Sequence, residues 1–257
     1  MTEGGRRPPK FPLRLDQMAV PKKTLVKAAP AASPPTGLGL DSAGVRMRMV
    51  ERLRAEGLRH EGVLAAMAAV PRHCFVDAAL VTQAYEDTSL PIGHGQTISK
   101  PSVVARMIEL LMAGSSARAA GRIGRVLEIG TGCGYQAALL ARVARQVYSV
   151  ERVKPLHDKA RDLMAPLRIT DVRLIYGDGR LGHPPNAPYD GIIAAAGGEA
   201  LPQAWLDQLA VGGRIVAPVH DGEARQVLVV VDRTEQGYTR SVQETVQFVP
   251  LRSGLVR

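Results

Sequence analysis

The sequence predicts an α/β fold with a mostly parallel sheet, helices on both of its faces and a helical N-terminal addition. From residue 125 onward, short apolar segments alternate with amphipathic helical segments, which is the pattern of a parallel sheet. A glycine-rich turn follows the first apolar segment directly, as it does where open α/β sheets bind ligands. Before residue 120, apolar residues recur at helical spacing instead.

Two helices open the predicted domain. Val45, Met49 and Leu53 form an apolar stripe that ends at Gly57, and a second helix stops at Pro71. Residues 90–99 are predicted to be a loop before a helix that starts near Pro101. The remaining elements are predicted as follows: strands at 125–129, 147–151, 172–176, 190–195, 214–219, 226–231 and 242–250, and helices at 135–144, 154–167 and 202–209. The last two strands have no helix between them, so we expect an antiparallel pair there.

The first 42 residues are predicted to be a disordered, basic, proline-rich tail. Residues 1–40 hold 7 of the 18 prolines and more than half of the formal net charge of +9. A solvated extension and a nucleic-acid-binding arm are both open readings of this tail. Residues 43–257 are expected to form one domain, with a helical addition at 43–120 and a ligand-binding core at 121–257.

Cysteine content and hydropathy bear on the compartment. Cys74 and Cys133 are too few for a disulfide framework, and no apolar run approaches the roughly 18 residues of a membrane helix. The start of the chain does not have the pattern of a secretory signal. We therefore expect a cytoplasmic protein that does not contact a membrane.

The glycine turn indicates the chemistry of the ligand. Gly130, Gly132 and Gly134 allow a tight turn and a close approach to the strand ends. A dinucleotide fingerprint would place its third glycine at position 135, which is Tyr135, so a pyrophosphate is disfavoured. A carboxylate at Glu128 would repel phosphate and attract a cationic ligand.

Acidic residues follow the next two predicted strands. Glu151 closes the second strand, where a carboxylate is suited to hold both hydroxyls of a ribose. Asp178 and Gly179 follow the third strand and are placed to border an adenine. Each feature alone is also compatible with an ordinary strand end or turn. Together, a nucleoside and a cation without pyrophosphate describe S-adenosylmethionine.

This order of motifs resembles the class I S-adenosylmethionine-dependent methyltransferases, which implies a Rossmann-like fold. The amine-methylating motif expected after the fourth strand is absent, since residues 194–198 read Ala-Ala-Ala-Gly-Gly. No histidine or acidic cluster has metal-ligand spacing, so we expect no metal.

Residues 70–76, Tyr85, residues 90–101 and residues 248–251 resemble the signature of the protein-L-isoaspartate O-methyltransferases. The resemblance implies methyl transfer to the α-carboxylate of L-isoaspartyl residues in damaged proteins and peptides. We do not expect a nucleic-acid partner. It implies that Ser99 is catalytic and that Thr97 and Ile98 bind substrate. It also implies cofactor-binding roles for Glu128, Gly130, Gly132, Gly134, Glu151, Asp178 and Gly179.

Some alternatives stay open at this point. Ser99 either orients the substrate carboxylate beside the start of a helix, where an anion is favoured, or only caps that helix. The basic tail suggests a methyltransferase that acts on RNA. The unusual loop 194–198 suggests a module that binds S-adenosylmethionine without catalysis.

Overall fold

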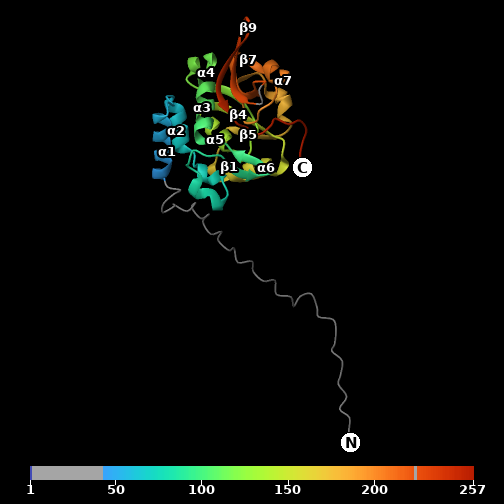
Figure 1. The fold of residues 1–257 in the computed structure, drawn as a ribbon. Coiled ribbons are helices and arrows are strands. Elements are labelled where there is room, and N and C mark those ends of the chain that lie inside the picture. Colours follow the sequence, from blue (N-terminus) through green and yellow to red (C-terminus); the bar gives the residue numbers. More distant parts are fainter. Residues whose placement is uncertain (2–42, 223–224) are drawn as a thin grey trace, which may run out of the picture. The chain divides into compact units, whose positions relative to one another are not determined.

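A computed structural model describes Met1 and residues 43–222 and 225–257 (Figure 1). The predicted basic tail falls outside the described residues, apart from Met1. The feature that suggested an RNA substrate lies outside the described part of the chain as well.

A seven-stranded sheet in the order β5-β4-β3-β6-β7-β8-β9 forms the centre of the fold. The first five strands in this order are parallel, and β8 and β9 are joined to them in antiparallel fashion. The predicted mostly parallel sheet with an antiparallel end is therefore confirmed. The strands are β3 (Ile123–Ile129), β4 (Ala144–Glu151), β5 (Val172–Tyr176), β6 (Tyr189–Ala194), β7 (Leu209–His220), β8 (Gln226–Thr234) and β9 (Gly237–Val246).

Helices cover both faces of the sheet, as the alternating pattern predicted. They are α1 (Ala43–Ala55), α2 (Glu61–Ala69), α3 (Pro101–Met112), α4 (Ser115–Ala120), α5 (Tyr135–Val143), α6 (Lys154–Met164) and α7 (Gln203–Asp207). In Figure 1, α1 and α2 lie outermost, beyond α3 and α5. The short 3₁₀ helices at 72–75, 78–83, 165–167, 179–181 and 184–186 were not predicted, nor was α4, because segments this short show no periodicity. None of the described helices is long and apolar enough to cross a membrane.

Two apolar clusters hold these layers together. The larger one joins the buried faces of α1, α2, α3 and α5 to one side of the sheet. The smaller one lies on the other side, around Trp205 of α7, which is 1% exposed. The Trp205 indole Nε1 donates to the carbonyl of Gly179 at 2.8 Å. This contact ties the second layer to the loop that follows β5.

The predicted loop at 90–99 is wrong, because this segment is a two-stranded hairpin. β1 (Leu90–Gly93) pairs antiparallel with β2 (Gln96–Ile98). His94 and Gly95 both have positive φ angles, 53° and 67°, as a two-residue turn between twisted strands requires. The buried side chains of Leu90, Ile92 and Ile98 pack the hairpin against the core. Pro91 and two glycines hide this strand pattern in the sequence.

Candidate active site

The carboxyl ends of β5, β4, β3 and β6 meet at one edge of the sheet, where a cavity of about 470 Å³ opens. The hairpin lines this cavity from the other side, so the N-terminal addition and the core form one site. Seven of the predicted site residues line it: Thr97, Ile98, Ser99, Gly130, Gly132, Glu151 and Gly179. The other three, Glu128, Gly134 and Asp178, do not.

The glycine turn after β3 brings its backbone to the cavity wall. Gly132 has a φ of 56°, and a Cβ atom there would lie 3.2 Å from the Cδ1 atom of Ile92 in the hairpin. Gly134 precedes α5 with a φ of 91°, and a Cβ atom there would lie 2.8 Å from the Met164 sulfur. Gly134 therefore allows α5 to pack closely against α6.

The Glu151 carboxylate stands at the end of β4 and is only 5% exposed. Its Oε2 atom accepts from the backbone N–H of Gly132 at 2.9 Å, and Oε1 accepts from that of Val153 at 2.9 Å. Each carboxylate oxygen has further acceptor capacity. Glu151 therefore braces the glycine turn and also presents a negative charge to the cavity.

Glu128 is fully buried beneath the cavity. The Ser149 hydroxyl donates to Oε2 at 2.5 Å and lies 2.6 Å from the Thr131 hydroxyl, which lines the cavity. Oε1 has no hydrogen-bond partner among the described residues, although the nearby Gln136 amide acts to lower the pKa. Loss of hydration outweighs these contacts and raises the pKa of Glu128 to about 8. Burial therefore opposes ionisation of Glu128, which works against the expected attraction of this carboxylate for a cationic ligand.

The Asp178 side chain accepts hydrogen bonds from two backbone N–H groups and does not line the cavity. Its Oδ1 atom accepts from the N–H of Arg180 at 2.9 Å, and Oδ2 accepts from the N–H of Gly254 at 2.6 Å. The neighbouring Gly179 does line the cavity, and a Cβ atom there would lie 2.5 Å from Ile129 Cγ2. Only the glycine of the predicted adenine-side pair is in the wall.

Ser99 does not cap α3. The N-cap residue is Lys100, and its side chain makes no capping hydrogen bond. Asp87 serves the helix start instead, since Oδ1 accepts from the Ser102 N–H at 2.9 Å and Oδ2 from the Ser102 hydroxyl at 2.7 Å. The anion expected at this helix start is therefore Asp87 itself. The half-buried Ser99 makes no side-chain hydrogen bond within the described part of the chain and lines the cavity.

The wall of the cavity suits S-adenosylmethionine. A cavity of about 470 Å³ is in the usual range for small-ligand sites, and the Glu151 carboxylate can accept from ribose hydroxyls. Across residues 43–222 and 225–257, no group of three His, Cys, Asp or Glu side chains is placed to hold a metal ion.

Comparison with known proteins decides the family. The family model of the protein-L-isoaspartate(D-aspartate) O-methyltransferases matches residues 45–255. The chain belongs to this family. Among its relatives, the protein-L-isoaspartate O-methyltransferase of Methylibium petroleiphilum is 60% identical over 270 aligned positions, which cover 99% of each chain. That of Leptothrix cholodnii is 67% identical over 220 positions, which cover 85% of this chain and 77% of the relative.

Solved structures agree with this assignment. A protein-L-isoaspartate O-methyltransferase structure with 27% identity has a TM-score of 0.72 and covers 82% of this chain and 67% of its own. A Plasmodium falciparum structure in complex with S-adenosyl-L-homocysteine shares the fold, with 24% identity, a TM-score of 0.66 and coverage of 80% of this chain and 98% of its own. The chain is an S-adenosylmethionine-dependent methyltransferase with a Rossmann-like fold, as the motifs predicted.

Sequence analysis missed several residues of this isoaspartyl methyltransferase site. Thr131 lines the cavity from within the glycine turn, and Arg252 and Val256 line it from near the end of the chain. Thr131 lies inside the Gly-Thr-Gly motif, so its place was readable. Nothing local in the sequence connects residues 252–256 with the strand ends.

Proposed function

We propose that this chain methylates the α-carboxylate of L-isoaspartyl residues in peptides and proteins, and that Ser99 orients that carboxylate. One observation carries the proposal. A single cavity is lined by the hairpin residues Thr97, Ile98 and Ser99 on one side and by the glycine turn and Glu151 on the other. A methyl donor held at the strand ends and an acceptor held at the hairpin would meet in that cavity.

At the donor end, the residues of the strand ends hold the cofactor. S-adenosylmethionine supplies a methyl group that is activated by its sulfonium charge. The Glu151 carboxylate accepts from the ribose hydroxyls, while Gly130 and Gly132 let backbone approach the cofactor closely. Thr131 presents a hydroxyl that the Ser149 hydroxyl, 2.6 Å away, keeps in one orientation.

At the acceptor end, the reaction needs orientation rather than a base. A carboxylate is already ionised at neutral pH, so no proton has to be removed before it attacks. The buried Ile98 side chain anchors β2, and the Ser99 hydroxyl is available to donate one hydrogen bond to a carboxylate oxygen. Holding the two reacting groups in line and excluding water then supply most of the rate.

The peptide on either side of the isoaspartyl residue also needs room. A second cavity of about 630 Å³ shares Ser99 with the first and is lined further by Lys100, Val103 and Phe248, among others. We assign the flanking peptide chain to this second cavity. An isoaspartyl side chain at Ser99 would then reach the donor while its peptide stays outside the cofactor cavity.

The decisive experiment measures labelled methyl transfer to an isoaspartyl peptide and to its normal aspartyl isomer. We expect methylation of the isoaspartyl peptide alone. Cofactor binding without methylation of either peptide would instead support a non-catalytic binding module. Deletion of residues 1–40 is expected to leave this activity intact, which would remove the reason for the RNA alternative. We also propose a cytoplasmic location, because Cys74 and Cys133, the two cysteines of the sequence, form no disulfide.

A further inference from the structure

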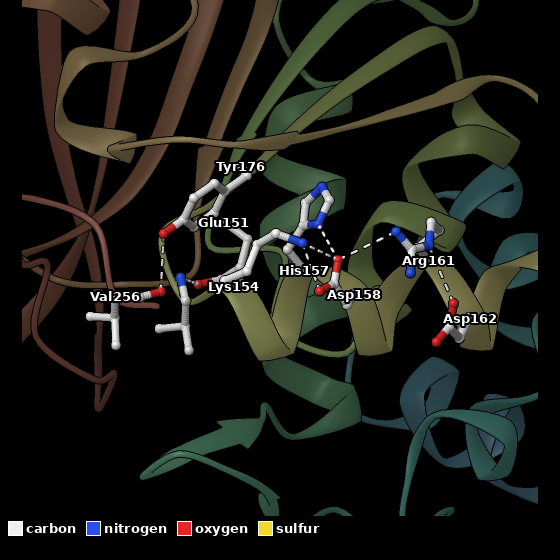
Figure 2. A network of polar contacts seen from close by, with 9 residues as sticks. Glu151, Lys154, His157, Asp158, Arg161, Asp162, Tyr176 and Val256 are labelled. Atoms are coloured by element: carbon white, nitrogen blue, oxygen red, sulfur yellow. Dashed lines mark hydrogen bonds and ion pairs between the residues drawn. The ribbon is translucent and has the colours of Figure 1, made fainter.

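Residues 252–256, called the strap below, cross the ends of β4 and β5 beside the cofactor cavity. The Val256 N–H donates to the carbonyl of Arg152 at 2.8 Å, and the Lys154 N–H donates to the carbonyl of Val256 at 2.8 Å. Val153 and Val256 thereby form a parallel bridge. Figure 2 shows Val256 beside Glu151 and Tyr176, at the N-terminal end of α6.

Three side chains from the strand ends fasten the strap. Arg152 donates through Nε to the carbonyl of Gly254 at 2.8 Å and through a terminal nitrogen to that of Ser253 at 3.1 Å. The Tyr176 hydroxyl donates to the carbonyl of Val256 at 3.1 Å, as Figure 2 shows. The Asp178 carboxylate accepts from the N–H of Gly254 at 2.6 Å.

Little apolar burial supports these contacts. Leu255 is 53% exposed and Val256 is 39% exposed, and the rest of the strap is exposed as well. A segment that is held by exposed hydrogen bonds opens locally at a small free-energy cost. The strap is thus fastened well enough to have one conformation but weakly enough to open.

The strap also forms part of the cavity wall. Arg252 and Val256 line the cavity together with Glu151, Arg152 and Val153. The N–H of Val153 donates to Glu151 Oε1, while the carbonyl of Arg152 accepts from the strap. The same two residues therefore connect the proposed ribose-binding carboxylate to the strap.

The geometry points to a retaining strap: residues 252–256 hold the cofactor at the Glu151 end of the cavity, and Asp178 is a positioning residue that fixes the strap through Gly254. This inference rests on the use of S-adenosylmethionine and on the proposed place of Glu151 in its site. It does not depend on which acceptor is methylated.

The test measures how fast S-adenosyl-L-homocysteine leaves the full-length protein, by rapid mixing with an excess of competing ligand. Gly254→Ala is the first variant, because Gly254 has a φ of 76° and a Cβ atom there would meet nothing within 4 Å. The substitution therefore disfavours the strap conformation without a clash. We expect release to be about five- to thirtyfold faster. This factor corresponds to the free-energy cost of placing a non-glycine residue in the left-handed backbone conformation.

Gly121→Ala is the matched control. Gly121 has a φ of 68° with nothing within 4 Å of the added atom, and it lies between α4 and β3. It carries the same backbone penalty away from the strap, so we expect the wild-type release rate. Deletion of residues 253–257 is a second variant and should also speed release.

A double variant identifies the role of Asp178. If Asp178 acts through the strap, Asp178→Asn and Gly254→Ala are non-additive, and the double variant releases ligand no faster than the quicker single variant. Wild-type release rates in both Gly254→Ala and the deletion variant would overturn the proposed strap. Additive effects in the double variant would overturn the proposed action of Asp178 through the strap. Release kinetics that follow this expectation would stand even if isoaspartyl peptides proved not to be substrates.

Discussion

Replacement of Glu128 by Gln is expected to remove a pH-dependent loss of stability. Glu128 is 0% exposed, and burial raises its pKa from 4.5 to about 8. The folded protein therefore binds this proton more tightly than the unfolded chain does. Such a group contributes stability below the unfolded pKa, and this contribution is lost as the pH rises through the folded pKa.

The size of the effect follows from the two pKa values. One pKa unit corresponds to about 1.4 kcal/mol, so a rise from 4.5 to about 8 removes about 4 kcal/mol of unfolding free energy between pH 5 and pH 9. Glu128→Gln keeps the shape, lets the amide oxygen accept from Ser149 and cannot ionise. The variant should become more stable than the wild type, by up to this amount, as the pH approaches 9.

Urea unfolding of both proteins at several pH values between 5 and 9 measures this difference. Glu56→Gln, a substitution of an exposed carboxylate between α1 and α2, is the control for the loss of one surface charge. A difference between Glu128→Gln and wild type that stays constant from pH 5 to pH 9 would refute the conclusion that Glu128 is neutral when buried.

Four further predictions concern the site and the helix beside it. Ser99→Ala should lower single-turnover methyl transfer by about ten- to a hundredfold, the loss of one hydrogen bond to a charged group, with an unchanged melting temperature; a lower melting temperature with normal turnover would show that Ser99 is only structural. Asp87→Ala should lower the free energy of unfolding in urea by about 0.5–2 kcal/mol, because α3 loses its cap. Wild-type stability of this variant would contradict the capping role of Asp87. Glu151→Ala should weaken cofactor binding by about 1–3 kcal/mol in calorimetry, and unchanged affinity in a folded variant would remove Glu151 from the site. Finally, exhaustive chelation should leave methylation intact, whereas activity that returns only with added Mg²⁺ would indicate a different class of methyltransferase.

The sequence by itself determined the elements of the core and the edge of the sheet at which the site lies. Buried strands, the glycine turn at 130–134 and Glu151 are read from patterns that span a few residues. Their carboxyl ends converge in any parallel sheet of this kind, so the sequence predicts the side of the cavity that the strand ends form. The signature around Ser99 indicated the family, which the comparison confirmed.

Only the tertiary structure decided the state and the partners of the side chains. The raised pKa of Glu128 comes from burial on all sides, which no local pattern encodes. Asp87 reaches the start of α3 from 15 residues away in the chain, and Asp178 meets Gly254 across 76 residues. The fold brings distant backbone N–H groups to these carboxylates. The resulting hydrogen bonds replace part of the hydration that each carboxylate loses on folding. The sequence predicts most of the candidate residues of this site, and the packing of the chain determines which of them face the cavity.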